Sequence, residues 1–199
     1  IILTKTMLIN EQNSNGLTPL MLAIYYGHDE IAMALLRQIN DVDQKSIHDE
    51  TPLHLVAKKG WLDIVKILMS KTKLINETNK NGDTPLVLAI SHGHVDVAKV
   101  LLEEINNADQ KNVDGNTPLH FAAQKGWLDI VKTLLTKTKL INEQNKNGNT
   151  PLSLAMAFNC LDIAEMLVNM VGNVDGITID GESPLHYAAK WGRPNLLKM

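Results

Sequence analysis

The main signals for the fold of this chain lie in one stretch, TPLHFAAQKGWLDIVKTLLTKTKLINEQNKNGN (Thr117–Asn149). The Thr-Pro pair at its start is typical of a helix N-terminus, because Thr caps the first turn with its hydroxyl and Pro suits the first helical position. Leu119, Ala122 and Ala123 follow at helical spacing, and Gly126 is a residue type that ends helices. The first part of the stretch therefore predicts one short helix.

The second part predicts another short helix and a turned loop. Asp129 would lie in the first helical turn, where the helix dipole stabilises a negative charge. An apolar stripe follows, made of Ile130, Val131, Leu134 and Leu135. Asn147-Gly148 then marks a tight turn, since Gly tolerates positive φ. A helix pair of this size is too short to bury its apolar face alone, so neighbouring units must stack.

The same unit recurs along the whole chain. The tripeptide Thr/Ser-Pro-Leu returns every 33 residues, at Thr18, Thr51, Thr84, Thr117, Thr150 and Ser183. This period predicts one repeat domain over 1–199, with repeats at 18–50, 51–83, 84–116, 117–149 and 150–182 and partial repeats at 1–17 and 183–199. Because 1–10 aligns with 67–76, inside a second helix, we expect the chain to be part of a longer array.

The repeat starts carry a resemblance to a known family. They read TPLHLVA from Thr51, TPLHFAA from Thr117 and SPLHYAA from Ser183, and TPLMLAI, TPLVLAI and TPLSLAM from Thr18, Thr84 and Thr150. Over its full length the chain resembles the ankyrin repeat family, in its 33-residue period and its T-P-L-H-x-A signature. The resemblance implies an all-α solenoid of stacked helix-turn-helix units joined by β-turn or hairpin loops. It also implies that the chain binds a partner protein along a concave groove.

Departures from the family pattern lead to two predictions. Where the family usually has Gly after the second helix, this chain has Ile39, Thr72, Ile105, Thr138 and Val171. Asn40, Asn106 and Gly172 come one position later, so we infer that a left-handed cap has shifted by one residue in those units. Lys73 and Lys139 hold that place in the other two units, and the sequence offers no comparable explanation for them. Asp49 replaces the loop glycine of the other units, and we expect the 47–50 loop to differ in shape.

The units alternate between two kinds, so the full period is 66 residues. The last core position of the first helix reads Ile24, Ala57, Ile90, Ala123, Met156 and Ala189, and one core position of the second helix reads Ala32, Val65, Ala98, Val131, Ala164 and Leu197. A large residue on one helix is thus matched by a small one on the other, which conserves volume. We hypothesise that the two positions touch. Duplication of a two-repeat segment is the alternative, and it explains the matching surface residues better.

No pattern in the chain predicts an active site. His54, His120 and His186 share one slot of the repeat, which indicates a structural hydrogen bond near the helix start, and no Ser or Cys nucleophile accompanies them. His92 and His94 form the only close histidine pair, without carboxylate or thiol ligands nearby. P-loop, GxGxxG and HExxH motifs are absent. We predict no enzyme, no catalytic residue, no metal and no cofactor, with Cys160 as an inert thiol.

Composition narrows the choice of partner and compartment. A formal net charge of −3 gives no basic surface for nucleic acid. No apolar run approaches the roughly 18 residues that cross a bilayer. One cysteine excludes an internal disulfide framework, and a reducing compartment is the simplest interpretation. We therefore expect an intracellular, cytoplasmic protein with no nucleic-acid, membrane or small-molecule ligand.

The resemblance places the partner-binding residues on a groove wall and on loop tips. The wall comprises Tyr25, Tyr26, Lys58, Lys59, His92, Gln124, Lys125, Phe158, Lys190 and Trp191, and the tips comprise Ile47, His48, Glu50, Asp83, Asp114 and Asn116. Aromatic residues at both ends are candidate hot spots. The lysines between them favour a partner with an acidic segment. The alternative is that these lysines only keep the surface soluble.

The sequence therefore predicts a protein-interaction scaffold. The alternative is that this segment is the targeting arm of a larger enzyme, channel or secreted microbial effector whose active domain lies outside these residues. For a secreted effector the compartment would be the host cytoplasm. Trp61 and Trp127, at the turn between the two helices of their units, are expected to pack over that turn rather than to bind a ligand.

Overall fold

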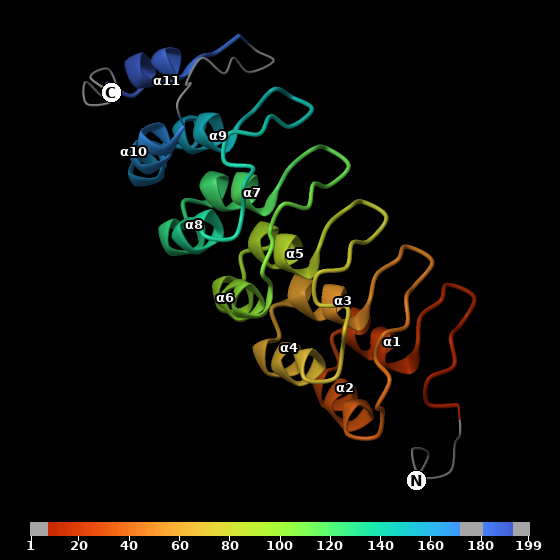
Figure 1. Ribbon diagram of the computed structural model, residues 1–199. Helices are drawn as coiled ribbons and strands as arrows, with labels where there is room; N and C mark the ends of the chain where they lie inside the picture. The colour runs from red at the N-terminus through yellow and green to blue at the C-terminus, as the bar shows by residue number, and fades with distance from the viewer. Residues whose placement is uncertain (1–7, 172–180, 193–199) are drawn as a thin grey trace. The chain divides into compact units, whose positions relative to one another are not determined.

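The computed structural model describes residues 8–171 and 181–192 of the chain (Figure 1). The chain divides into two compact units, Ile1–Ile105 and Asn106–Met199, and each is described by itself. In the described residues there are eleven α-helices and no strand. The fold is all-α, with helix-turn-helix repeats, as the sequence predicts. That 1–199 forms a single array stays a prediction.

The first helix of each repeat begins at the proline of the Thr/Ser-Pro-Leu motif. The residue before it is extended, with φ between −77° and −96°, and the Oγ1 of Thr18 accepts the Met21 N–H at 3.3 Å. This is the cap that the motif predicts. These helices are α1 (Pro19–Tyr26), α3 (Pro52–Lys59) and α5 (Pro85–Ser91) in the first unit, and α7 (Pro118–Lys125), α9 (Pro151–Ala157) and α11 (Pro184–Lys190) in the second.

Left-handed glycines end several of these helices, as predicted for Gly126. Gly27, Gly60 and Gly126 have φ of 85°, 76° and 74°, and their N–H groups bond to carbonyls of the last helical turn. Only a residue without a Cβ adopts this conformation at little cost. The chain then turns sharply into the second helix.

The second helix of each repeat carries an aspartate in its first turn, where the dipole stabilises it. These helices are α2 (Asp29–Leu36), α4 (Leu62–Met69) and α6 (Val95–Glu104) in the first unit, and α8 (Leu128–Leu135) and α10 (Leu161–Met170) in the second. In the first unit, α1, α3 and α5 pack in one layer and α2, α4 and α6 in the other. In the second unit, α7, α9 and α11 form one layer and α8 and α10 the other (Figure 1).

The core between the layers is aliphatic. The motif leucines Leu20, Leu53, Leu86, Leu119 and Leu152 are at most 1% exposed. The alternating residues are buried as well: Ile24, Ala57, Ile90, Ala123 and Met156 on the first helices, and Ala32, Val65, Ala98, Val131 and Ala164 on the second. Burial on both sides is what volume matching requires, but contact between the two positions stays a prediction. Leu197 lies outside the described residues, and Ala189 is exposed.

The left-handed cap predicted for the second helices is wrong at Asn40 and Asn106. The only non-glycine residues with positive φ in the described part are Asp49 and Asn159. Ile39 and Ile105, which precede the two asparagines, are 2% and 4% exposed. Burial of the isoleucine thus sets the path of the chain, and it outweighs the turn preference of the asparagine. The third predicted cap, Gly172, lies outside the described residues.

In repeats 51–83 and 117–149, a threonine takes the place of the isoleucine and forms a hydrogen bond to the preceding repeat. The hydroxyl of Thr72 donates to the Asp43 carboxylate, and the hydroxyl of Thr138 donates to Asp109 at 2.5 Å. Each pair joins a residue of one kind of unit to a residue of the other. Because each pair needs an aspartate in one kind of repeat and a threonine in the next, these bonds give the 66-residue period a structural reason.

The same carboxylates hold the backbone at Lys73 and Lys139, the two positions for which the sequence offers no left-handed cap. Their backbone N–H groups donate to Asp43 and Asp109, at 3.4 and 2.9 Å. Burial raises the pKa of Asp109, but the hydrogen bonds from Thr138 and from the backbone lower it by more. The pKa of Asp109 therefore lies below its ordinary value of 3.8.

A lysine of the next repeat closes the end of α2. The Nζ of Lys71 donates to the carbonyls of Leu36 and Ile39 at 2.7 and 2.6 Å. A cation at this position satisfies carbonyls that the helix leaves unpaired and opposes the negative end of its dipole. The repeat therefore depends on its neighbour for its C-terminal cap.

Candidate functional site

The loop between successive repeats is closed by one polar side chain. Its oxygen accepts two backbone N–H groups, two and four residues further on, at 2.9 to 3.3 Å. The residues that provide this oxygen are Asn13, Ser46 and Asn79 in the first unit, and Asn112 and Asn145 in the second. A side chain of this type satisfies the backbone locally and fixes the shape of the tip.

The 47–50 loop was expected to differ from the others, and that prediction is wrong. Asp49 has φ 58°, close to the 70° of Gly16 at the same place one repeat earlier. The Ser46 N–H donates to the Glu50 carbonyl at 2.9 Å, and the same bond joins Asn13 to Leu17 at 3.0 Å. Asp is among the few non-glycine residues that tolerate this backbone conformation, so the loop keeps its shape.

Neighbouring tips are tied to one another within each unit. In the first unit the Ile47 N–H donates to the Asn15 carbonyl, and the Lys80 N–H to the His48 carbonyl, both at 3.0 Å. In the second, the Lys146 N–H donates to the Asp114 carbonyl at 2.8 Å. A Cβ at Gly16 would lie 2.9 Å from the Ile47 nitrogen, which shows how closely the tips approach. The tips therefore form a rigid row.

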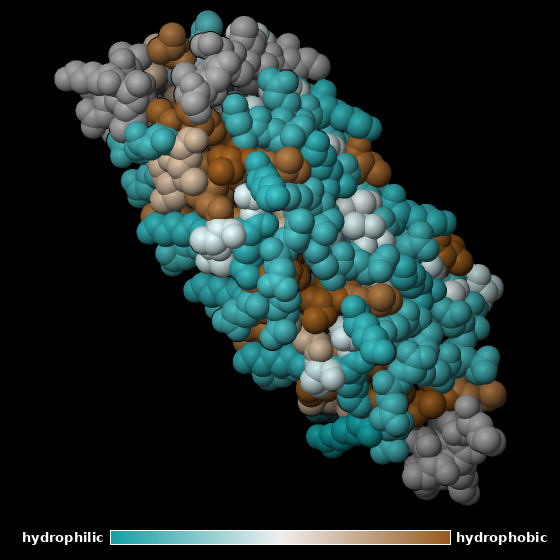
Figure 2. All heavy atoms as spheres, in the orientation of Figure 1, coloured by the Kyte–Doolittle hydropathy of each residue, from teal (hydrophilic) through white to brown (hydrophobic). Residues whose placement is uncertain are grey.

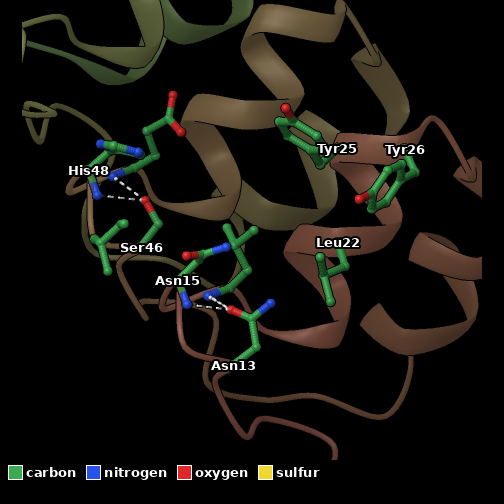
Figure 3. A pocket seen from close by; sticks show the side chains of 10 residues that line it. Asn13, Asn15, Leu22, Tyr25, Tyr26, Ser46 and His48 are labelled. Carbon is green, nitrogen blue, oxygen red and sulfur yellow. Dashed lines mark hydrogen bonds between the residues drawn. The ribbon is translucent and has the colours of Figure 1, made fainter.

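Five of the predicted partner-binding residues come together in the first unit. Tyr25, Tyr26, Ile47, His48 and Glu50 line a pocket of about 370 Å³. Figure 3 shows the tyrosines and Leu22, from α1, on one side of it and Asn15, Ser46 and His48, from the tips, on the other. The structure therefore brings these five wall and tip residues together around one hollow, and their role in partner binding stays a prediction.

The pocket combines apolar walls with an unpaired acid. Tyr25 and Tyr26 are 58% and 67% exposed, with ring centroids 5.3 Å apart and planes at 83°. Ile47 is 47% exposed. The half-buried carboxylate of Glu50 forms no ion pair within the described part of the chain. On the face seen in Figure 2, hydrophobic residues form patches between larger areas of hydrophilic surface.

The other predicted residues of the first unit lie beyond the pocket. Lys58 and Lys59 are exposed in the last turn of α3, without an ion pair to any described residue. His92 folds back on its own helix: its Nδ1 lies 3.0 Å from the Leu88 carbonyl, which can only accept. Asp83 is half-buried, and its carbonyl is 3.1 Å from the Nε2 of His54. His92 and Asp83 therefore take part in hydrogen bonds that stabilise the fold, in addition to any role at a surface.

In the second unit the predicted residues are more engaged with the protein itself. The Nε1 of Trp191 donates to the Met156 carbonyl at 2.8 Å. Lys190 pairs with Glu182 at 3.7 Å. The Asn116 side-chain oxygen accepts from Asn145 at 2.7 Å. Four further positions remain available: Phe158 is 54% exposed, Lys125 and Asp114 are exposed, and Gln124 is half-buried. No pocket described in this unit gathers these residues.

Buried histidines at the repeat starts confirm the predicted structural role. The Nδ1 of His54 accepts the Thr51 N–H at 3.1 Å, so its Nε2 carries the proton and donates to the Asp83 carbonyl. His120 makes the matching bonds to Thr117 and Asn149. Burial lowers the pKa of both histidines from 6.5 to about 4. Both are therefore neutral at pH 7 and unsuited to acid–base work.

A second hollow lies at the inter-helix turns of α7 and α9. Gly126, Asn159, Cys160 and neighbouring residues line about 460 Å³ there. Burial raises the pKa of the Cys160 thiol, so the thiol is protonated and unreactive, as predicted. In the described residues no group of three or more His, Cys, Asp or Glu could hold a metal ion.

The pocket also includes residues that the prediction left out. Leu22 shares a helix face with Tyr25 and Tyr26, three and four residues along α1, a spacing that could have identified it. Asn13 and Ser46 reach the pocket because two loop tips lie side by side. No local sequence signal marks that proximity.

The repeats define a class of protein: helix-turn-helix units stacked side by side, with rigid loop tips along one edge of each unit. Models of "Ankyrin repeats (3 copies)" match residues 38–112, 103–177 and 140–199, and a model of a single "Ankyrin repeat" matches 15–47. The chain belongs to the ankyrin repeat family. No curated protein matches it. Within the described residues no helix has the length and apolar character to cross a bilayer.

Proposed function

We propose that this chain is a protein-interaction scaffold that binds a partner through the pocket and groove wall of its first unit. Ankyrin repeats are generally protein–protein interaction modules without catalysis of their own. The observation that supports the proposal is the pocket that Tyr25, Tyr26, Ile47, His48 and Glu50 share. Exposed aromatic side chains beside a rigid wall are typical of interface hot spots.

The fold does not require these residues. Positions equivalent to Tyr25 and Tyr26 carry Lys58 and Lys59 one repeat later, and Ser91 and His92 after that. A side chain that the repeat can exchange freely is available for recognition. We further propose a cytoplasmic site of action, since the one cysteine makes an internal disulfide impossible and the fold needs none.

Site-specific photo-crosslinking tests the proposal. A benzophenone amino acid at position 26 is expected to capture a protein that one at Ile31 does not capture. Ile31 is a matched control, because it is an exposed apolar residue of the same unit, 54% exposed, on α2. Affinity for the captured protein should fall at least tenfold in Tyr26→Ala and remain unchanged in Ile31→Ala. Equal loss in both variants, or capture at position 31 alone, would contradict the assignment of the surface.

A further inference from the structure

The acid in the pocket, Glu50, forms no ion pair with any residue that the structure describes. Glu50 is held by its backbone, since its N–H donates to the Ser46 hydroxyl at 3.3 Å and its carbonyl accepts the Ser46 N–H at 2.9 Å. Its carboxylate pairs with no cation in the described residues. Equivalent positions in other repeats carry Leu17, Asp83 and Asn116, so the loop does not need an acid there.

A side chain that binds in the pocket should not remove water from the Glu50 carboxylate without providing a new partner for its charge. A purely apolar side chain would cover the tyrosines and Ile47 well, but it would also remove water from Glu50 without compensation. A lysine or arginine meets both demands, because its aliphatic stem packs on apolar surface while its charged end reaches a polar group. Two tyrosine rings at 83° also offer a ring face to a cation.

The next repeat presents the opposite charge at the equivalent place. Lys58 and Lys59 occupy on α3 the positions of Tyr25 and Tyr26 on α1, are exposed, and pair with no described acid. Helices α1 and α3 are packed neighbours, so these positions are about 10 Å apart. An extended chain in the polyproline II conformation covers that distance in roughly three residues, at about 3.1 Å each, and its side chains three residues apart point the same way.

We propose that the first unit binds an extended segment of its partner carrying a basic residue and, about three residues away, an acidic one. The basic side chain enters the pocket between the tyrosines and the loop tips, toward Glu50, and the acidic one meets Lys58 and Lys59. This inference rests on the proposed function and deepens it. It refines the acidic segment expected from the lysines: the acid is one half of a pair of opposite charges.

Four short peptides and the full chain test the pair of charges. The probes are unstructured twelve-residue Gly/Ser peptides with the central sequences KSSE, QSSE, KSSQ and QSSQ, titrated against the ¹⁵N-labelled protein and followed by backbone amide shifts. Exposed ion pairs and cation–π contacts are weak, so each removed charge should lower affinity roughly threefold. The shifts of KSSE should centre on Tyr25, Tyr26, Glu50 and Lys59. No binding by any of the four, or shifts centred on α2, α4 and α6, would overturn the proposal.

Variants of the protein assign each charge to its partner. In Glu50→Gln, KSSE and QSSE should bind equally, whereas Glu30→Gln, an exposed acid of α2, should leave their ratio unchanged. In Lys58→Gln/Lys59→Gln, KSSE and KSSQ should bind equally. Tyr26→Phe keeps a ring face and should bind KSSE as before, whereas Tyr26→Leu should weaken it. If the Glu50→Gln variant still binds KSSE more tightly than QSSE, the assignment of the basic side chain to the pocket is wrong.

The proposal and the scaffold function fail in different ways. A partner crosslinked at position 26 whose contact segment lacks this pair of charges would overturn the charge pattern and leave the scaffold standing. Absence of any partner at position 26 would overturn the scaffold itself. Lengthening the spacer to KSSSSSSE tests the distance alone, and it should lower affinity to that of QSSE or KSSQ.

Discussion

The two kinds of repeat fill the same positions with different chemistry. Repeats 51–83 and 117–149 place a buried histidine after Thr-Pro-Leu, where repeats 18–50 and 84–116 place Met21 and Val87, which are also buried. The first kind ties its helix start to the next loop through an imidazole, and the second packs an apolar side chain there. The repeat therefore fixes the backbone geometry, but the same position accepts a polar or an apolar side chain, and the two differ in their sensitivity to pH.

Acid should produce the largest difference between the two kinds. His54 and His120 have a pKa of about 4 in the folded chain and about 6.5 when unfolded, so the unfolded chain binds more protons between these values. The free energy of unfolding should therefore fall as the pH drops from about 6.5 to about 4, by about 3 kcal/mol per histidine. Urea unfolding followed by circular dichroism at four pH values measures this loss.

A variant of the other kind provides the control. His54→Met/His120→Met gives both repeats the residue found at Met21, and its unfolding free energy should lack the pH dependence of this window. Asp109 interferes little, because its pKa is lowered below 3.8 and most of its stabilisation is lost below the lower end of this window. An unchanged slope in the variant would show that the histidines do not carry the effect.

The turn between the helices should give the next largest effect. Gly60 lies under the next repeat: a Cβ there would be 2.3 Å from the His94 ring, whose Nε2 donates to the Lys58 carbonyl. Gly27 has a similar φ but open space around it. Gly60→Ala should destabilise the chain by about 3 kcal/mol, from backbone strain together with overpacking, and Gly27→Ala by about 1 kcal/mol, from strain alone.

Thermal unfolding of both variants measures this difference. Adding His94→Ala to Gly60→Ala removes the ring, and it should recover most of the excess over Gly27→Ala. If the two alanine variants lose equal stability, the ring does not restrict the turn and the contact between these repeats is looser than described.

The threonine–aspartate pair should give a smaller effect. Thr72→Ile with Asp43→Asn rewrites both positions as they read in the opposite kind of repeat, at Ile105 and Asn76. Thr72→Ile removes the hydroxyl donor, and Asp43→Asn replaces the charged acceptor with a weaker, neutral one; each single change should cost about 1 kcal/mol, because the site is only partly buried. A double-mutant cycle by urea unfolding should give a coupling of about 0.5–1 kcal/mol. Strict additivity would show that the pair does not link the two repeats.

Most of the helices and the repeat period could be predicted from local signals in the sequence. Thr-Pro at a helix start, glycine at its end and the 33-residue period act within a few residues, so helices and repeats followed from the sequence. The ends of the second helices could not be predicted in this way, because burial of Ile39 and Ile105 outweighs the turn preference of Asn40 and Asn106. In the pocket, Tyr25 and Glu50 could be placed by repeat position. Ser46 could not, because its proximity to α1 depends on how successive loops are held together.

The loop tip at Asp49 provides the smallest test, and its sign is opposite. Asp49 keeps the left-handed conformation, φ 58°, that glycine holds at Gly16 and Gly82. An L-residue is strained there by about 1 kcal/mol, and glycine removes the strain but adds freedom to the unfolded chain. Asp49→Gly should therefore stabilise the protein by about 0.5 kcal/mol, measured as a higher urea midpoint with an unchanged slope. Asn159→Gly, at φ 59°, should stabilise less, because Asn adopts this conformation more readily. A loss of stability in Asp49→Gly would mean that the aspartate side chain holds the tip, and that the 47–50 loop differs from the others after all.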